Sequence, residues 1–238
     1  MPFSILPALI PDIRTVYDVF FSAFQADPKD ALLLDILFPG GRVNTPEFRE
    51  GHRSGTLNWW HTSTDQYTFK CIDTDTGEIV GMALLDVYIR ERSEEQRKNP
   101  GVLWLQGKER ELAERIVNPL ADMREKLWGG RPYIYCHVIA VKPEFQRQKA
   151  GTAIVSWQKD LVDQLGLPMY LESNPSIKNF YEKMGFETLP ETIVHKAGDL
   201  GTDEDVEVPL MVRMPACANG MSFQDWRAQG YPSWRIHG

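Results

Sequence analysis

Apolar residues in the first 60 positions recur at the spacing of helices. A short apolar strand is predicted at 3–9, and Asp12 then caps the start of a helix. One face of that helix carries Ile13, Val16, Phe20 and Phe24. A second short helix is predicted at 31–38, and the run Thr45-Pro46-Glu47 is typical of the start of a third helix.

After position 65 the pattern changes to that of β-strands. The ranges 66–72 and 79–89 predict a hairpin, and its second strand, IVGMALLDVYI, is apolar on both faces and therefore expected in the centre of a sheet. A polar segment and a long helix then occupy 91–130. The apolar face of that helix carries Leu112, Ile116, Leu120, Met123 and Leu127. Because this segment can bury little by itself, we interpret it as a helical insertion.

From Tyr133 the predicted order is strand, helix, strand, helix, strand, strand. The first helix ends at Gly166 and the second just before Gly185. The four strands are expected at 133–141, 168–173, 186–195 and 206–214. The tail, 215–238, contains two tryptophans but no clear periodicity. These patterns predict one domain over 1–238 of the α+β class, with a mixed sheet.

Composition and charge exclude several classes of function. A chain of 238 residues with 42% hydrophobic residues can bury a core, while a net charge of −7 argues against a general nucleic-acid binder. Cys71, Cys136 and Cys217 are far apart and outside any C-x-x-C spacing, so neither a disulfide framework nor a metal site is expected. The N-terminus has no basic leader or long apolar run, and we expect a soluble, cytoplasmic protein without a membrane partner.

The run VKPEFQRQKAGTA, 141–153, joins a predicted strand to a predicted helix. Such a junction offers unpaired backbone N–H groups and the positive end of a helix dipole, which together suit an anion. Arg147 and Lys149 add positive charge there, and Thr152 adds a hydroxyl. Taken alone, the run is also typical of a solvated basic turn.

Two motifs in this region resemble the GNAT superfamily of acyl-CoA-dependent N-acetyltransferases. They are Val141-x-Pro143-x-x-Gln146 and Asn174 followed by FYEKMGF at 180–186. The runs LGLP and YLE, within 165–172, are similar to those of fungal-type GNAT proteins. The resemblance implies a central, mostly antiparallel sheet flanked by helices, with the insertion before its fourth strand. It also implies acetyl-CoA as co-substrate and no metal.

In this family a Q/R-x-x-G-x-G/A loop binds the pyrophosphate of coenzyme A. Here the loop fits either Gln146-x-x-Lys149-x-Gly151 or Gln148-x-x-Gly151-x-Ala153. We prefer the first alignment because both flanks then agree with the family, although lysine replaces the first glycine. The coenzyme contacts implied by the resemblance are Ile139, Ala140, Val141, Gln146, Arg147, Gln148, Lys149, Ala150, Gly151, Thr152, Asn174 and Tyr181.

Two of these coenzyme contacts have a second interpretation. Asn174 also fits a helix cap before Pro175, and Tyr181 also fits a core aromatic. On one helix the two would project from nearly the same face. In GNAT enzymes a tyrosine at the place of Tyr181 hydrogen-bonds the coenzyme sulfur and acts as general acid. A phenol can do so because its pKa of about 10 lets it protonate a leaving thiolate.

A general base is less clearly indicated. Odd positions of the strand 133–141 are expected on one face, which groups Tyr135, His137, Ile139 and Val141. Tyr135 and His137 fall where arylalkylamine N-acetyltransferases carry two histidines, so His137 is a candidate base and Tyr135 a candidate substrate contact. Glu172 is the competing base, and proton transfer to bulk water is a third route.

Trp59 and Trp60 lie where the family builds part of its acceptor wall, although plain core packing also explains them. The leading hypothesis is acetyl transfer from acetyl-CoA to a primary amine of a small molecule by direct attack. A protein lysine or N-terminal amine is an alternative acceptor, ranked lower because the segment 91–130 would roof a small-molecule pocket. A non-catalytic acyl-CoA sensor is the other alternative. An oxygen acceptor and a homodimer are left open.

Overall fold

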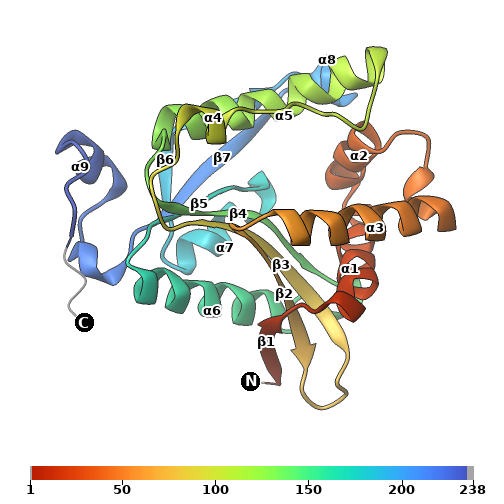
Figure 1. Ribbon diagram of the computed structural model, residues 1–238, viewed down its shortest axis with the longest axis horizontal. Helices are drawn as coiled ribbons and strands as arrows, with labels where there is room; N and C mark the ends of the chain where they lie inside the picture. Colours follow the sequence, from red (N-terminus) through yellow and green to blue (C-terminus); the bar gives the residue numbers. More distant parts are fainter. Residues whose placement is uncertain (1, 235–238) are drawn as a thin grey trace.

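The computed structural model describes residues 2–234 and contains a seven-stranded mixed sheet with helices on both faces (Figure 1). The strand order is β1-β2-β3-β4-β5-β7-β6, and every neighbouring pair is antiparallel except β4 and β5. The predicted fold class and the mostly antiparallel sheet are confirmed. The strands are β1 (Phe3–Pro7), β2 (Gln66–Asp73), β3 (Ile79–Tyr88), β4 (Tyr133–Val141), β5 (Met169–Glu172), β6 (Glu187–His195) and β7 (Val206–Arg213).

The helices follow the predicted order, with additions near the C-terminus. They are α1 (Ile13–Ala26), α2 (Pro28–Leu37), α3 (Pro46–Thr62), α4 (Glu94–Arg97), α5 (Gly107–Trp128), α6 (Ala150–Leu165), α7 (Lys178–Lys183), α8 (Ala197–Leu200) and α9 (Phe223–Ala228). Single 3₁₀ turns are η1 (Ile10–Asp12), η2 (Arg42–Asn44), η3 (Pro143–Phe145), η4 (Pro175–Ile177) and η5 (Ala216–Ala218). The sequence pattern did not predict α8 or α9, nor the short helix α4 inside the segment 91–130.

Of the two N-cap residues predicted in the first 60 positions, Thr45 caps its helix and Asp12 does not. The Thr45 hydroxyl accepts from the Phe48 N–H at the start of α3, as its sequence predicts. The carboxylate of Asp12 does not cap α1. It accepts instead from the Leu9 N–H and from Nζ of Lys70, at 2.8 and 2.6 Å, because the short turn η1 precedes the helix.

The two faces of the sheet are covered by different helices. In Figure 1, α5 runs along the top of the sheet and α6 along the bottom. Ile154 and Val155 of α6 pack on one face, whereas Leu127 and Trp128 of α5 pack on the other, and α1 extends that second layer over β3 and β4. The segment 91–130, which we interpreted as an insertion, therefore supplies part of the buried core.

The C-terminal tail is held by large aromatic side chains instead of a periodic pattern. Phe223 and Trp226 of α9 are buried against Trp128. The indole N–H of Trp234 donates to the carbonyl of Gly166 at 2.7 Å, which ties the tail to the end of α6. Within residues 2–234, no helix combines the length and the apolar character needed to cross a membrane.

Candidate active site

The sheet opens between β4 and β5. These parallel strands pair only at Ile134 with Met169 and at Tyr135 with Tyr170, whereas β4 stays paired with β3 as far as Val141. Within the part of the chain that the structure describes, the edge of β4 from 136 to 141 therefore has no neighbouring strand on the β5 side. Its backbone N–H and C=O groups can hydrogen-bond a ligand there.

A β-bulge lies at the start of this open edge. Leu84 of β3 is opposite Val138, but Leu85 is opposite Cys136, so His137 has no partner on β3. The extra residue reverses the alternation of side chains beyond it. Tyr135 packs on the α5 side of the sheet, while Ile139 packs on the α6 side. The expectation that Tyr135, His137, Ile139 and Val141 share one face is therefore wrong.

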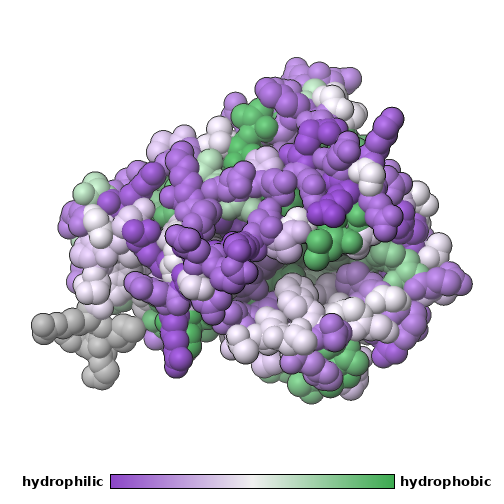
Figure 2. All heavy atoms as spheres, turned by 45° about the horizontal axis from the view of Figure 1, so that its top comes forward, coloured by the Kyte–Doolittle hydropathy of each residue, from purple (hydrophilic) through white to green (hydrophobic). Residues whose placement is uncertain are grey.

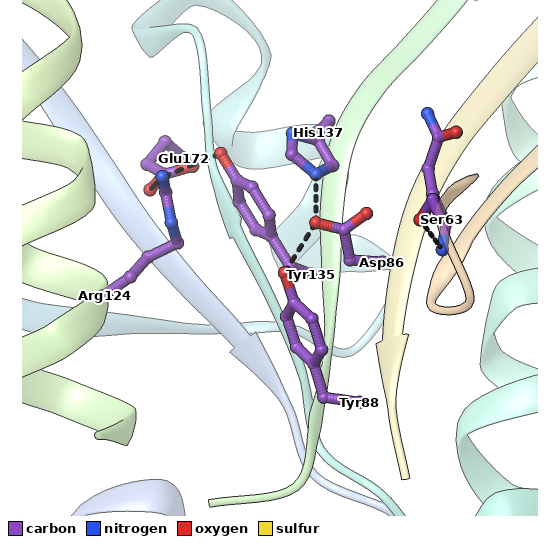
Figure 3. A network of polar contacts seen from close by, with 8 residues as sticks. Ser63, Asp86, Tyr88, Arg124, Tyr135, His137 and Glu172 are labelled. Atoms are coloured by element: carbon purple, nitrogen blue, oxygen red, sulfur yellow. Dashed lines mark hydrogen bonds and ion pairs between the residues drawn. The ribbon is translucent and has the colours of Figure 1, made fainter. Parts of the chain in front are cut away.

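His137 is held by a carboxylate on the neighbouring strand (Figure 3). Its Nε2 lies 2.7 Å from Oδ2 of Asp86, and the same oxygen accepts from the Tyr88 hydroxyl at 2.7 Å. Burial disfavours the charged form of Asp86, but His137, the Tyr88 hydroxyl and Arg124 outweigh it and lower the pKa of this carboxyl. The carboxylate can thus orient the imidazole and stabilise it when protonated.

Sequence reasoning missed Asp86, although a signal was present. It is the single charged residue in the otherwise apolar strand 79–88, and its side chain is only 13% exposed. Charged residues are rarely buried unless paired or functional. A charged residue in this apolar strand could have identified Asp86 as a candidate. Its partner, His137, lies 51 positions later and can be found only from the register of the two strands.

Glu172 already has a cationic partner. Nη1 of Arg124, from α5, donates to Oε1 of Glu172 at 3.0 Å and to the Tyr135 hydroxyl at 2.9 Å. The Glu172 side chain is 9% exposed, and the guanidinium also lies over the Tyr135 ring at 4.3 Å. This arrangement orients Tyr135 and Glu172 as neighbours (Figure 3). Because the Glu172 carboxylate is already ion-paired with Arg124, His137 is the better placed of the two candidate bases.

Asn174 lies outside the helix that carries Tyr181. It is the N-cap of η4, where its Oδ1 accepts from the Ser176 N–H at 2.9 Å, so the capping interpretation is confirmed. Its Nδ2 donates to Asp30 of α2 at 3.0 Å. Because α7 begins only at Lys178, the expectation that Asn174 and Tyr181 project from one helix is wrong.

Tyr181 presents a buried, neutral phenol. Its side chain is 6% exposed and packs between Phe180 and Phe186, and burial raises its pKa well above the usual value. Among residues 2–234, no group hydrogen-bonds its hydroxyl. Cys136, on the open edge of β4, is also buried, and burial raises the pKa of its thiol to about 12. A thiol in that state is a poor nucleophile.

A cavity of about 280 Å³ brings most of these groups together. One end is lined by Tyr135, His137, Ile139, Glu172, Asn174 and Tyr181. Residues from α2 and α5 line its outer side, and the face of the molecule over this region is mostly hydrophilic (Figure 2). Trp59 and Trp60 of α3 are not among the lining residues: Trp59 is 41% exposed, and Trp60 packs with the core under α1.

The loop before α6 lies outside the cavity lining and has an unusual backbone. Arg147 and Lys149 take left-handed conformations, with φ of 61° and 75°. Such angles favour glycine, and Lys149 is the position where our preferred alignment puts the family's first glycine. Gly151, by contrast, lies in the regular first turn of α6. The geometry thus supports the alignment Gln146-x-x-Lys149-x-Gly151.

The loop before α6 offers backbone N–H groups that a ligand can accept from. The N–H groups at 150–152, in the first turn of α6, precede the first helical bond, which runs from the Ala153 N–H to the Lys149 carbonyl, and within the part of the chain that the structure describes neither Arg147 nor Lys149 forms an ion pair. The amide of Gln146 donates to the Val141 carbonyl at 3.2 Å, which holds the loop against β4. A Cβ atom on Gly151 would meet nothing within 4 Å, so the backbone is open to a ligand. Helix N-termini with free N–H groups and nearby cations bind phosphate.

Comparisons with known proteins agree with this geometry. The acetyltransferase (GNAT) domain family matches residues 66–188, just over half of the chain. The chain is similar to the probable acyltransferase SID5 of Ajellomyces capsulatus, at 32% identity over 143 residues, covering 60% of this chain and 99% of that relative. The chain therefore belongs to the GNAT acetyltransferase family. It is an acyl-CoA-dependent N-acyltransferase, and enzymes of this family use acetyl-CoA.

Solved structures share the fold. A mosquito arylalkylamine N-acetyltransferase like 5b has a TM-score of 0.61 at 14% identity, covering 89% of this chain and 99% of its own. A structure titled histone acetyltransferase HPA2 and related acetyltransferase, from Corynebacterium glutamicum, has a TM-score of 0.57 at 20% identity, covering 90% and 97%. At these identities the likeness concerns the fold alone.

Proposed function

We propose that this chain transfers the acetyl group of acetyl-CoA to a primary amine of a small molecule by direct attack in the cavity between β4 and β5. The observation that carries the proposal is the His137–Asp86 pair at the β4 bulge, which shares the cavity with the neutral phenol of Tyr181. A base that takes the proton of the amine and an acid that protonates the leaving sulfur both accelerate the acylation of an amine by a thioester.

The donor would bind along the open edge of β4. Acetyl-CoA supplies the activated thioester. Backbone N–H groups of 147–152, with the charges of Arg147 and Lys149, would hold the pyrophosphate. Backbone groups of Ile139–Val141, which face no strand on the β5 side, would bind the remainder of the coenzyme and polarise the acyl carbonyl.

The reaction needs three proton transfers: two protons leave the protonated amine, and one reaches the leaving sulfur. An alkylamine with a pKa near 10 is neutral in only about one molecule in a thousand at pH 7, so its proton needs an acceptor. His137 would take this proton, directly or through one water, while Asp86 stabilises the imidazolium. As the C–N bond forms and the C–S bond breaks, Tyr181 would give its proton to the leaving sulfur. The nitrogen, which carries two protons after the attack, then gives one of them to the Tyr181 phenolate through water, and the His137 imidazolium releases its proton to solvent. The products are an amide, a free thiol and one proton.

The acceptor would enter from the side of α2 and α5. Asp30 of α2 lines the cavity and, among residues 2–234, has no cationic partner. A carboxylate that is not ion-paired attracts an ammonium group. Ile116 and Leu120 of α5 also line the cavity, so the segment 91–130 contributes to its roof. Such a roof favours a small molecule over an extended peptide.

An amine panel tests the proposal. Purified protein is incubated with acetyl-CoA and either small amines or peptides with a free lysine or N-terminus, and thiol release is followed. We expect turnover on small amines alone. Turnover only on peptides would move the acceptor to protein, and tight coenzyme binding without turnover would favour the sensor. If coenzyme A did not bind at all, the assignment of the loop at 146–152 would be wrong.

Two matched variants test the predicted acceptor wall in the same assay. Trp59→Ala and Trp60→Ala should change the order of amine preference only if an indole contacts the acceptor. Because neither tryptophan lines the cavity, we expect the order to stay the same.

A further inference from the structure

The cavity extends well beyond the reacting groups, to His195 at the end of β6. Both β5 and β6 pair with β7. Glu172 is opposite Leu210 and His195 is opposite Val206 on that strand. Leu210 and Val206 are four residues apart on β7, which places Glu172 and His195 ~13 Å apart along the direction of that strand. The cavity therefore has a far end at His195, distant from Glu172 on β5.

His195 is a buried polar side chain that has no hydrogen-bond partner within residues 2–234. It is 8% exposed and lines the cavity. Its Nδ1 is buried without a hydrogen bond, and neither ring nitrogen is bonded to any group in the described range 2–234. Buried polar groups are nearly always hydrogen-bonded. A buried imidazole without a hydrogen bond therefore indicates that a ligand supplies the missing partner.

The surroundings of His195 define the chemistry of that ligand. Ile116, Leu120, Val206 and Val208 give the space between the two ends an apolar lining. Asp199 of α8, the charged group that acts on the His195 ring, is paired with Arg115 of α5 at 2.7 Å. Burial lowers the pKa of His195, which keeps its ring neutral at pH 7. The far end is therefore suited to an uncharged hydrogen-bonding group.

We infer that the acceptor is an elongated amine, with its reacting amine at His137, an apolar middle, and an uncharged hydroxyl or amide at its far end that hydrogen-bonds His195. This inference rests on the proposed function and narrows its substrate class. His195 then determines specificity and takes no part in the chemistry. The 280 Å³ cavity is also larger than an acetyl group and an ammonium group require.

Two series of matched substrates test the inference. Straight-chain amines from propyl to octyl are compared with the amino alcohols of the same lengths, and the readout is the ratio of kcat/KM between the two. In the wild type we expect a preference of about tenfold for the amino alcohol at the length that reaches His195. In His195→Leu the ratio should fall to about one, and His195→Gln should restore part of it.

Val194→Ala is the matched control, because Val194 precedes His195 on β6 and is 40% exposed. It should keep the wild-type ratio. An unchanged ratio in His195→Leu, or no preference at any length in the wild type, would overturn the inference. Melting curves confirm that each variant is folded.

Two further arms separate this inference from the proposed function. If no amine is turned over, the proposed acetyl transfer fails, and calorimetric binding of the amino alcohols in the presence of coenzyme A then decides the inference. Weaker binding to His195→Leu supports it, and equal binding overturns it. If His195→Leu changes the selectivity among acyl-CoA chain lengths but not among amines, the far end belongs to the donor and the acceptor assignment is wrong.

Discussion

Replacing Lys149 by glycine should stabilise the protein, which is unusual for a lysine-to-glycine change. Lys149 is the N-cap of α6 and has a φ of 75°. A side chain in the left-handed region brings Cβ close to the following carbonyl oxygen, and glycine removes that contact. The lysine is exposed and, within the described chain, forms no ion pair, so its loss removes no other interaction.

The expected gain is the difference between two terms. Relief of the left-handed strain is worth about 1–2 kcal/mol. Glycine gives the unfolded chain more conformational entropy, which costs about 0.4–1 kcal/mol. The net effect is an increase of about 0.5–1 kcal/mol in the free energy of unfolding, which for a chain of this size raises Tm by about 1–4 °C.

Urea denaturation and calorimetry measure this change, with Lys149→Ala as the control. Alanine removes the charge but keeps Cβ, so its stability should stay within about 0.5 kcal/mol of the wild type. If Lys149→Gly were no more stable than Lys149→Ala, the left-handed conformation would be wrong. The alignment of the loop with the family motif would then lose its structural support.

Three other substitutions have expected outcomes. Asp86→Asn should lower activity by misorienting His137. The pKa of Asp86 is lowered in the fold, so its carboxylate stabilises the protein above about pH 4 and loses that effect as the pH falls. The free energy of unfolding of Asp86→Asn, measured in urea, should therefore depend less on pH in the acid range than that of the wild type. Arg124→Leu leaves the buried Glu172 without its cation and should cost about 3 kcal/mol, and adding Glu172→Gln should recover much of it; no recovery would show that the pair is not coupled. Trp226→Ala should cost about 3–5 kcal/mol in calorimetry if the tail belongs to the core, and a loss below about 1 kcal/mol would contradict its burial.

The sequence predicted the sheet because its strands and helices have clear apolar periods, and the two motifs at 141–153 and 174–186 identified the family. It could not predict the bulge at His137. One extra residue in YIYCHVIAV leaves the run apolar, and only pairing with β3 reveals which residue has no partner. The assumption of strict alternation therefore failed at the position that matters for the site.

Long-range partners were also beyond the sequence pattern. Arg124 lies in a segment without a family motif, and its contact with Glu172 joins residues 48 positions apart. His195 is one polar residue at the end of a strand, and only the assembled cavity shows that its ring has no hydrogen-bond partner among residues 2–234. In the tail, a few large aromatics supply the burial, so Trp226 and Trp234 left no periodic signal.

The central claim is that the open edge of β4 is the catalytic site, with Tyr181 as its acid. The direct measurement is kcat for thiol release by Tyr181→Phe, with the Kd of coenzyme A measured on the same preparation. We expect kcat to fall by a factor of about 10²–10⁴, with coenzyme affinity within a few-fold of the wild type. A Tyr181→Phe enzyme that keeps the wild-type kcat would contradict it.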